Sequence, residues 1–248
     1  MFDCGWLGFA DVTMFGLDND ETDVREMFVP CYLIEHADGR LLWDGGLPLA
    51  IAGKPRHEQQ PGVEVEYRVS VLEQLAALDL TPQDIDLVAY SHFHFDHVGA
   101  ANAFAGSKLL IQQTEWDAAF LHPEDNPVFE PALYDRLSES PKVLLNGDHD
   151  VFGDGSVRII SAPGHTPGHQ TLLVALANTG KIMLSGDLYH FEVSRTPRRT
   201  PEFNSDSQQT LASMDRVERL LESENATLWI EHNHKLSESL KKAPAYYD

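Results

Sequence analysis

Short apolar runs separated by turn residues recur along most of this chain and predict β-strands. Two of these runs flank Ala37-Asp38-Gly39, which predicts a hairpin. The predicted strands cover residues 28–35, 40–43, 85–90, 108–112, 142–145, 157–161, 171–176, 181–185 and 227–230. Strand-rich segments of this kind are typical of a protein built on more than one sheet.

Apolar residues at helical spacing predict helices between and after the strands. Tyr67, Val71, Leu75 and Leu78 form one face of a helix predicted over residues 65–80. Further helices are predicted over residues 114–121, 206–222 and 236–242. Because nothing in the composition indicates a linker, we expect a single domain over residues 1–248, with two sheets packed face to face and helices outside, an α/β (α+β) fold.

Two segments have no clear period. Residues 6–27 predict a loop, which either covers the core or forms an apolar wall beside a binding cleft. Residues 122–141 contain four prolines and predict an irregular excursion or lid.

The charge balance restricts the partners. With 18 Lys and Arg against 39 Asp and Glu, the formal net charge is -21, which opposes binding to nucleic acid or to an anionic membrane. No apolar run approaches the roughly 20 residues of a membrane span, and no signal peptide is visible. The compartment stays open: cytoplasmic, or periplasmic or secreted if a leader has been removed.

The two cysteines, Cys4 and Cys31, form no C-x-x-C pair. A disulfide framework or a cysteine-based zinc site is therefore not indicated, and two buried thiols are expected.

Candidate chemistry is concentrated in the stretch from Ser91 to Gly99, which contains three histidines and an aspartate within six residues. A hydrophobic core does not select such residues, because each buried imidazole or carboxylate needs a partner. Metal binding is the first hypothesis, and a histidine-rich surface loop is the alternative. His92 and His94 point the same way in an extended segment, whereas Asp96 and His97 belong to the next turn, which predicts two metal ions.

Other predicted strands also end at ligand-type side chains. The strand over 157–161 precedes His165, the strand over 181–185 precedes Asp187, and the strand over 227–230 precedes His232. Since the strands of one sheet layer end along a common edge, these residues are expected in one cleft with the histidine stretch. Asp187 between the two groups predicts a dinuclear site with a bridging carboxylate and hydroxide. Asp44 is either a turn residue or a carboxylate that orients a metal-bound histidine.

The order His-x-His-x-Asp-His, Gly-His-Thr-Pro-Gly-His, Ser-Gly-Asp and a late histidine resembles the metallo-β-lactamase superfamily over nearly the whole chain. The resemblance implies an αββα sandwich. It also implies that metal 1 is bound by His92, His94 and His165, metal 2 by Asp96, His97 and His232, and that Asp187 bridges them.

Within the superfamily the chain most resembles the N-acyl-homoserine lactonases, through the stretch around His92, the stretch from Ala162 to Gln170, the early Pro30-Cys31-Tyr32-Leu33 strand and the absence of a cysteine ligand. Those lactonases carry a tyrosine three residues after the bridging aspartate. Here His190 stands at that position, and Tyr189 is one residue earlier. Because a one-residue offset turns a side chain to the opposite face of an extended segment, we expect His190 to face the metals.

The remaining histidines are given lesser roles. His169 is expected to hold a loop, His232 is preferred over His234 as the late ligand, and His36, His57, His122 and His149 are expected at the surface.

The resemblance implies a hydrolase that opens the lactone ring of N-acyl-homoserine lactones. Two divalent ions, zinc first and cobalt, manganese or iron as alternatives, would share a bound water with a pKa of about 7, and the hydroxide formed from it would attack the lactone carbonyl. Asp96 or a water would protonate the leaving oxygen, and His190 or Tyr189 would contact the substrate. An apolar wall of Trp6, Phe9, Met14 and Phe15, with Phe93, would bind the acyl chain.

Other activities of the superfamily compete with this interpretation. A β-lactamase, a thioesterase or glyoxalase-like hydrolase and a phosphotriesterase would use the same ions with a different pocket. A mononuclear iron dioxygenase would be distinguished by its iron content and oxygen uptake. The negative net charge of the chain disfavours a ribonuclease. In a non-enzymatic metal-binding protein, the complete ligand set would have no catalytic role. The oligomeric state is left open, and a homodimer is compatible with the sequence.

Overall fold

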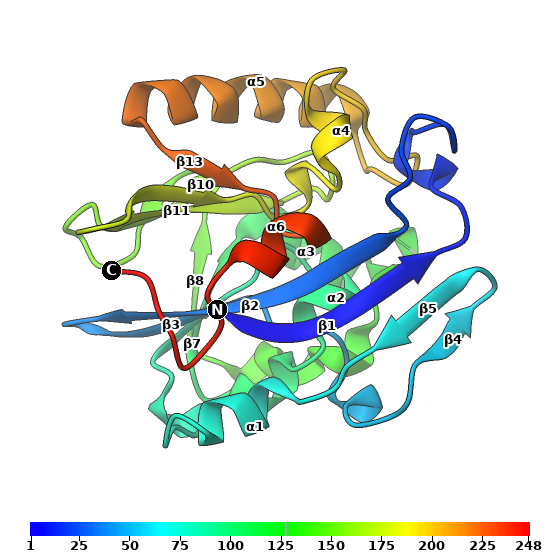
Figure 1. The fold of residues 1–248 in the computed structure, drawn as a ribbon. Helices are drawn as coiled ribbons and strands as arrows, with labels where there is room; N and C mark the ends of the chain where they lie inside the picture. The colour runs from blue at the N-terminus through cyan, green and yellow to red at the C-terminus, as the bar shows by residue number, and fades with distance from the viewer. Residues whose placement is uncertain (127) are drawn as a thin grey trace.

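Two β-sheets packed face to face form the centre of the protein in the computed structural model, which describes residues 1–126 and 128–248 (Figure 1). The larger sheet has the order β4-β5-β1-β2-β3-β6-β7-β8 and the smaller one the order β13-β12-β11-β10-β9. The strands of the larger sheet are β1 (Phe2–Phe9), β2 (Glu26–His36), β3 (Gly39–Trp43), β4 (His57–Gln60), β5 (Val63–Glu66), β6 (Leu87–Ala89), β7 (Lys108–Gln112) and β8 (Lys142–Leu145). Those of the smaller sheet are β9 (His149–Asp150), β10 (Val157–Ser161), β11 (Gln170–Leu176), β12 (Gly180–Leu184) and β13 (Thr227–Trp229).

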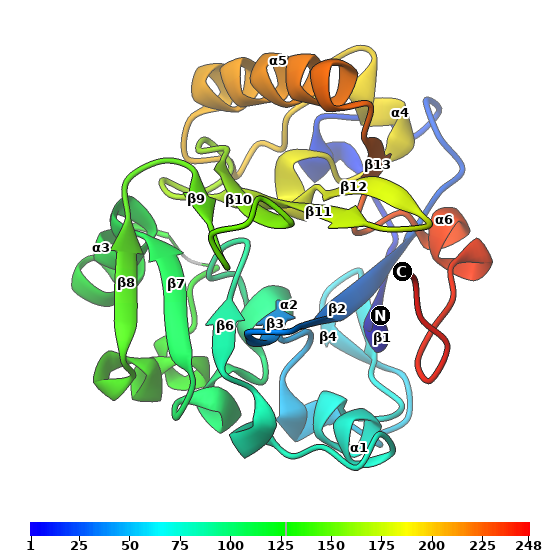
Figure 2. The same ribbon diagram turned by 90° about the vertical axis from the view of Figure 1, so that its left-hand side faces the viewer.

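Helices cover the outer faces of both sheets, as Figure 2 shows most clearly for α5 above the smaller sheet. They are α1 (Val71–Ala76), α2 (Phe95–Val98), α3 (Gln113–Leu121), α4 (Glu192–Arg195), α5 (Ser207–Glu224) and α6 (His234–Ser239). Both sheets contain parallel and antiparallel strand pairs. The predicted sandwich of two mixed sheets between helices is confirmed.

Alternation along the smaller sheet explains its two-sided burial. Ile159, Leu172 and Ile182 pack between the sheets with Trp43 and other residues of the larger sheet. Their neighbours Ile160, Leu173 and Met183 point to the other face and pack under α5 against Met214, Val217 and Leu221. Successive side chains of a strand point to opposite faces, so these apolar runs fill two cores at once.

The predicted hairpin and the late helix are confirmed. β2 and β3 pair antiparallel from Tyr32 with Trp43 to His36 with Gly39. Helix α5 begins after Asp206, whose side chain accepts the Gln209 N–H, and it ends at Asn225 in the left-handed conformation. The side-chain cap satisfies a backbone N–H at the start of the helix, and the left-handed residue ends it.

Two predictions for the first third of the chain are wrong. The sequence predicts a loop over residues 6–27, but the start of this segment belongs to β1, which pairs with both β2 and β5. A β-bulge between Asp3 and Trp6 interrupts the alternation there. The helix expected over 65–80 is only α1: residues Val63–Glu66 form β5, and Ser70 then starts the helix with a capping box. Spacing alone missed this boundary because Tyr67 belongs to the core without belonging to the helix.

The segment 122–141 is irregular, as predicted. Its described residues contain three short 3-10 helices, Pro123–Asp125, Pro131–Leu133 and Asp135–Glu139. Pro127, which belongs to the same prediction, lies outside the described residues.

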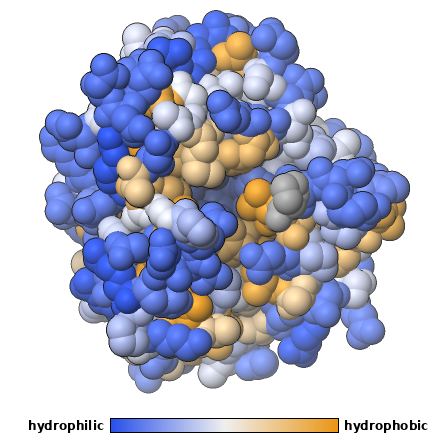
Figure 3. Space-filling model, turned by 90° about the vertical axis from the view of Figure 1, so that its right-hand side faces the viewer, coloured by the Kyte–Doolittle hydropathy of each residue, from blue (hydrophilic) through white to orange (hydrophobic). Residues whose placement is uncertain are grey.

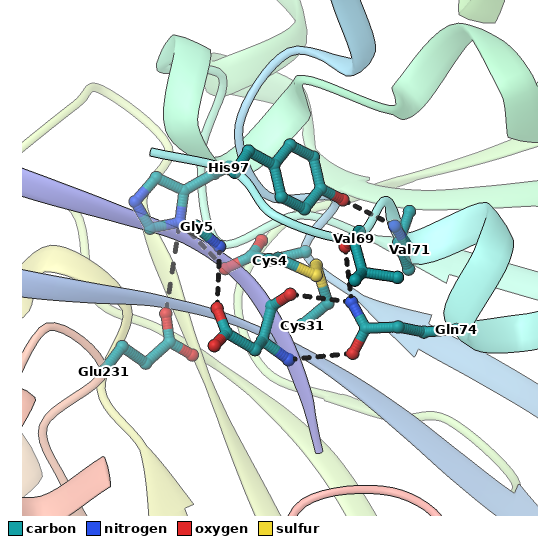
Figure 4. The surroundings of a disulfide bond; sticks show 11 residues. Cys4, Gly5, Cys31, Val69, Val71, Gln74, His97 and Glu231 are labelled. Atoms are coloured by element: carbon teal, nitrogen blue, oxygen red, sulfur yellow. Dashed lines mark hydrogen bonds and ion pairs between the residues drawn. A yellow bond between two sulfur atoms is a disulfide. The ribbon is translucent and has the colours of Figure 1, made fainter. Parts of the chain in front are cut away.

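Cys4 and Cys31 are joined by a disulfide, with an S–S distance of 2.06 Å (Figure 4). The expectation of two buried thiols was wrong about their state, although both residues are fully buried. In the strand register Phe2 pairs with Cys31, and the bulge that follows brings Cys4 to a Cα–Cα distance of 5.8 Å from it. No cysteine spacing in the sequence could have indicated this contact. Closing a loop over 27 residues restricts the unfolded chain, which is worth about 3 to 4 kcal/mol.

Among the described residues, no helix combines the length and the apolar character that crossing a membrane requires.

Candidate metal centre

The loops that follow β6, β10, β12 and β13 meet at one end of the sandwich and bring seven ligand-type side chains together. His92, His94, Asp96 and His97 follow β6, and the other three are delivered by one loop each: His165, Asp187 and His232. All seven are buried. They form two groups, within each of which the ligand atoms lie less than 4.8 Å apart: His92, His94, His165 and Asp187, and then Asp96, His97 and His232.

In the first group three imidazole nitrogens converge on one point. His165 Nε2 lies 3.2 Å from His92 Nε2 and 3.1 Å from His94 Nδ1. Asp187 Oδ2 lies 3.4 Å from His165 Nε2 and 3.7 Å from His92 Nε2.

In the second group the other oxygen of the same carboxylate takes part. Asp187 Oδ1 lies 2.9 Å from His232 Nε2 and 3.1 Å from His97 Nε2. Asp96 Oδ2 lies 3.6 Å from His232 Nε2 and 3.8 Å from His97 Nε2. Asp187 therefore faces the two groups with its two oxygens, as a carboxylate shared by two cations would.

The donor set fits divalent cations. Burial lowers the pKa of His92 and His165 well below the ordinary value and that of His94 to about 3, so these imidazoles are neutral and offer lone pairs. Among the described residues, His97 Nε2 and Asp187 Oδ1 are buried and form no hydrogen bond of good geometry, although they lie 3.1 Å apart. Burying such atoms is costly unless a proton or a cation compensates them.

The histidines of the second group behave differently. Burial opposes protonation of His232, but the Asp187 carboxylate outweighs it and raises the pKa to about 9. Burial likewise opposes protonation of His97, whose pKa nevertheless lies well above its ordinary value because of Asp187, Asp96 and Asp44. The second group thus attracts positive charge, and a divalent ion can supply it in place of these protons.

Further contacts orient the imidazoles of both groups. In the second group His97 Nδ1 donates to Asp44 Oδ2 at 2.9 Å, and His232 Nδ1 donates to the Phe28 carbonyl at 2.8 Å. Asp44 thus takes the orienting position that the sequence left open. In the first group His165 Nδ1 donates to Asn204 Oδ1 at 2.8 Å, and His92 Nδ1 lies 3.0 Å from Ser91 Oγ. Such contacts fix the tautomer and the direction of a metal-binding histidine.

Glu115 of α3 is a residue that the sequence reasoning missed. Its carboxylate accepts the backbone N–H of Phe93 at 3.0 Å and that of Gly168 at 2.8 Å. It thereby joins the loop of His92 and His94 to the loop of His165. Burial raises its pKa to about 7. The sequence holds no distinct signal for it, because a glutamate in the first turn of a helix is common.

The side chains of His190 and Tyr189 point in different directions. His190 is buried beside the cluster, with Nε2 at 3.0 Å from Asp187 Oδ2. Tyr189 points away from the cluster, and its hydroxyl donates to Glu218 of α5 at 2.9 Å. The candidate role of Tyr189 in contacting substrate is therefore corrected: Tyr189 has an extended backbone, so adjacent side chains face opposite ways.

The other histidines lie outside the two groups. His169 Nδ1 donates to the Ala162 carbonyl, and its Nε2 accepts the Asp187 N–H at 2.9 Å, so it holds two of the loops. His234 is partly exposed and lies 3.4 Å from Glu26.

An apolar cavity of about 160 Å³ opens onto both groups. Asp96, Asp187, His190 and His232 form its polar end, and its apolar walls are lined by Leu7, Phe9, Met14, Phe15, Met27, Val63, Phe95, Val128 and Phe203. Figure 3 shows this face hollowed at its centre, with apolar residues around the hollow.

Phe9, Met14 and Phe15 therefore lie where the sequence predicted an apolar wall, but Trp6 and Phe93 do not. The Trp6 ring lies under the Arg56 guanidinium at 3.7 Å, and its Nε1 donates to Glu26. Phe93 is fully buried between Tyr134 and Phe120. Both belong to strand or core packing outside the cavity.

Comparison with known proteins agrees with this geometry. The family model of the metallo-beta-lactamase superfamily matches residues 24–224. The N-acyl homoserine lactonase AttM of Azorhizobium caulinodans is 31% identical over 236 residues, which cover 90% of this chain and 88% of that protein. AttM of Rhizobium radiobacter is 32% identical with the same coverage.

The fold also matches a solved N-acyl homoserine lactone hydrolase with the product N-hexanoyl-L-homoserine bound at its catalytic metal centre. The TM-score is 0.83 at 23% identity, over 100% of this chain and 97% of the other. The resemblance indicated by the histidine motifs is confirmed: the chain belongs to the metallo-beta-lactamase superfamily and is in one family with these lactonases.

Proposed function

We propose that this protein is a dinuclear metal hydrolase that opens the lactone ring of N-acyl-homoserine lactones. The observation that carries the proposal is the position of Asp187, whose two oxygens face two groups of buried ligand atoms at the polar end of an apolar cavity. An amphipathic substrate with a polar ring and an apolar chain matches such a cavity. Relatives of the same family named as N-acyl homoserine lactonases support it.

We assign metal 1 to His92, His94 and His165 and metal 2 to Asp96, His97 and His232, with Asp187 between them. Zinc is the first choice, because a set rich in imidazole nitrogen with two carboxylates and no thiolate suits it, and cobalt, manganese and iron remain alternatives. When bound, such a pair lowers the pKa of a shared water to near neutrality and polarises the ester carbonyl.

The residues of this chain perform the remaining tasks. Phe9, Phe15 and the other apolar walls bind the acyl chain and keep water from the carbonyl. His190 Nε2 lies 3.0 Å from Asp187 Oδ2 at the polar end of the cavity, where it can donate to an oxygen of the lactone or of the opened product. Asp96, at the edge of the same cavity, carries the proton to the departing ring oxygen.

The test is a measurement of bound metal followed by turnover of a homoserine lactone series, nitrocefin, a thioester and an organophosphate. We expect close to two metal ions per chain and the highest kcat/KM for the lactones. A preference for nitrocefin, the thioester or the organophosphate would assign the site to one of the competing hydrolases. One iron per chain with oxygen uptake would indicate the dioxygenase.

A further inference from the structure

The disulfide lies close to the second group of ligand atoms. Figure 4 shows the Cys4–Cys31 bond between β1 and β2, with His97 and Glu231 on one side and Gln74 on the other. Both cysteines are fully buried, so the bond belongs to the packing around the site and is not a surface link.

The turn Asp44-Gly45-Gly46 connects the disulfide to His97. A Cβ on Gly46 would lie 2.3 Å from Cys4 Cβ and 3.1 Å from Cys31 Sγ, so the Gly46 backbone rests directly on the disulfide. The Leu47 N–H donates to the Cys4 carbonyl at 3.1 Å. At the other end of the same turn, Asp44 accepts the Nδ1 proton of His97.

The backbone of α2 is bound to the same turn. The Gly45 N–H donates to the His97 carbonyl at 2.6 Å, and the Gly99 N–H donates to the Gly46 carbonyl at 2.8 Å. His97 is thus held by its side chain to Asp44 and by its main chain to Gly45, and the next residue of the turn, Gly46, packs on the disulfide.

The second histidine of the group depends on the same strand pair. His232 Nδ1 donates to the carbonyl of Phe28, three residues before Cys31 on β2, and the Phe28 N–H donates to the His232 carbonyl at 3.3 Å. The orienting contacts of the first group come from Ser91, Asn126 and Asn204. Only Ser91 is tied to the turn, because its N–H and its hydroxyl donate to Asp44 at 2.6 and 2.9 Å.

From this asymmetry we infer that the Cys4–Cys31 disulfide is a positioning device mainly for metal 2. It clamps β1, β2 and the Asp44-Gly45-Gly46 turn so that His97 and His232 keep the directions that a metal ion needs, whereas metal 1 is linked to the turn through Ser91 only. The inference rests on the two-metal site of the proposed function.

The test replaces the disulfide with a pair of similar total volume, Cys4→Ala together with Cys31→Val, and titrates metal-free protein with cobalt. We expect one of the two binding steps to weaken about tenfold or more, the size usual for loss of an orienting contact, and the other to weaken much less. Exchangeable, paramagnetically shifted imidazole N–H resonances identify the site, because three histidines belong to the first group and two to the second. The two signals of His97 and His232 should be lost first.

Val174→Ala is the matched control. Val174 is buried between the sheets and away from both groups, so its truncation lowers the stability of the fold without touching either site. Gly46→Ala is a second variant: it keeps both cysteines but forces the turn off the disulfide, and it should weaken the same binding step. If the double variant does not fold, Gly46→Ala alone tests the inference.

Two results would overturn the inference: two unchanged binding steps in these variants, or an equal weakening of both steps. A wild-type protein that binds fewer than two cobalt ions would instead contradict the proposed function, so the two failures are distinguishable.

Discussion

At the scale of single residues, His190 is the side chain that sets this site apart from the pattern of the lactonases it resembles. It lies against Asp187 Oδ2 and packs on Phe15, with ring centroids 5.2 Å apart, so it belongs to the cluster and to the cavity wall at once. Tyr189 instead shares Glu218 with Arg195, which donates two hydrogen bonds to that carboxylate. His190 therefore belongs to the site, and Tyr189 anchors the loop to α5.

His190→Ala should lower kcat/KM for a homoserine lactone at least tenfold, about 1.4 kcal/mol in transition-state stabilisation, because a donor beside the reacting carbonyl is lost. Tyr189→Phe should leave kcat/KM nearly unchanged and lower the free energy of unfolding by about 1 kcal/mol. Steady-state kinetics and urea unfolding of the two variants, each with its metal content measured, check this. Equal, negligible losses in kcat/KM would remove His190 from the site.

At the scale of elements, the N-terminal strand and the short helix after it form one side of the cavity. β1 carries Leu7 and Phe9 into the wall, and the 3-10 helix Thr13–Phe15 places Phe15 above His190. Phe15 is held edge-on by Phe9, Phe191 and Phe203, with ring centroids 5.0 to 5.8 Å apart. This element therefore controls how much apolar chain the site accepts.

Phe15→Ala should enlarge the cavity and change the dependence of kcat/KM on acyl-chain length, with long-chain and short-chain lactones affected unequally. The buried ring is also worth about 3 to 5 kcal/mol of stability, so the comparison is made well below the melting temperature. Trp6→Ala is the control, because Trp6 lies on the same strand but outside the cavity. An identical response of all chain lengths to Phe15→Ala would contradict the proposed acyl-chain site.

At the scale of the whole molecule, the metal centre connects the two sheets. The larger sheet delivers the stretch after β6 and the orienting Asp44 after β3, and the smaller sheet delivers His165, Asp187 and His232. Ions bound there stabilise the sandwich by binding only to the folded state. They also compete with the protons that the second group attracts.

Metal removal by a chelator should lower the melting temperature, and adding zinc back should restore it. The pKa of His232 is raised to about 9 and that of His97 is also raised, so both carry protons at pH 7 in the metal-free protein. Metal binding must displace these protons, so its affinity should rise with pH up to about 9. Calorimetry in buffers of different ionisation enthalpy counts the protons released. Release of none at pH 7 would contradict the assignment of metal 2.

The elements that the sequence predicted well are those with a strong local signal. The β2–β3 hairpin has its turn residues, α5 has its apolar stripe and N-cap, and the strand Lys108–Gln112 is a compact apolar run. β1 and β5 failed because their strand character depends on pairing with each other across more than 50 residues. A register between distant segments leaves no local pattern to read.

The site residues differ in the same way in how far the sequence predicts them. The sequence alone determined which side chains are candidates for the metals, because histidines and aspartates gathered at the ends of buried strands are costly to bury without a cation or another partner. Only the tertiary structure decided that Asp187 faces both groups, that His190 and not Tyr189 borders the cavity, that Glu115 joins two loops, and that Cys4 meets Cys31. Each of these depends on the direction of a side chain after distant strands have paired, and such directions follow from packing across the chain and not from neighbours within it.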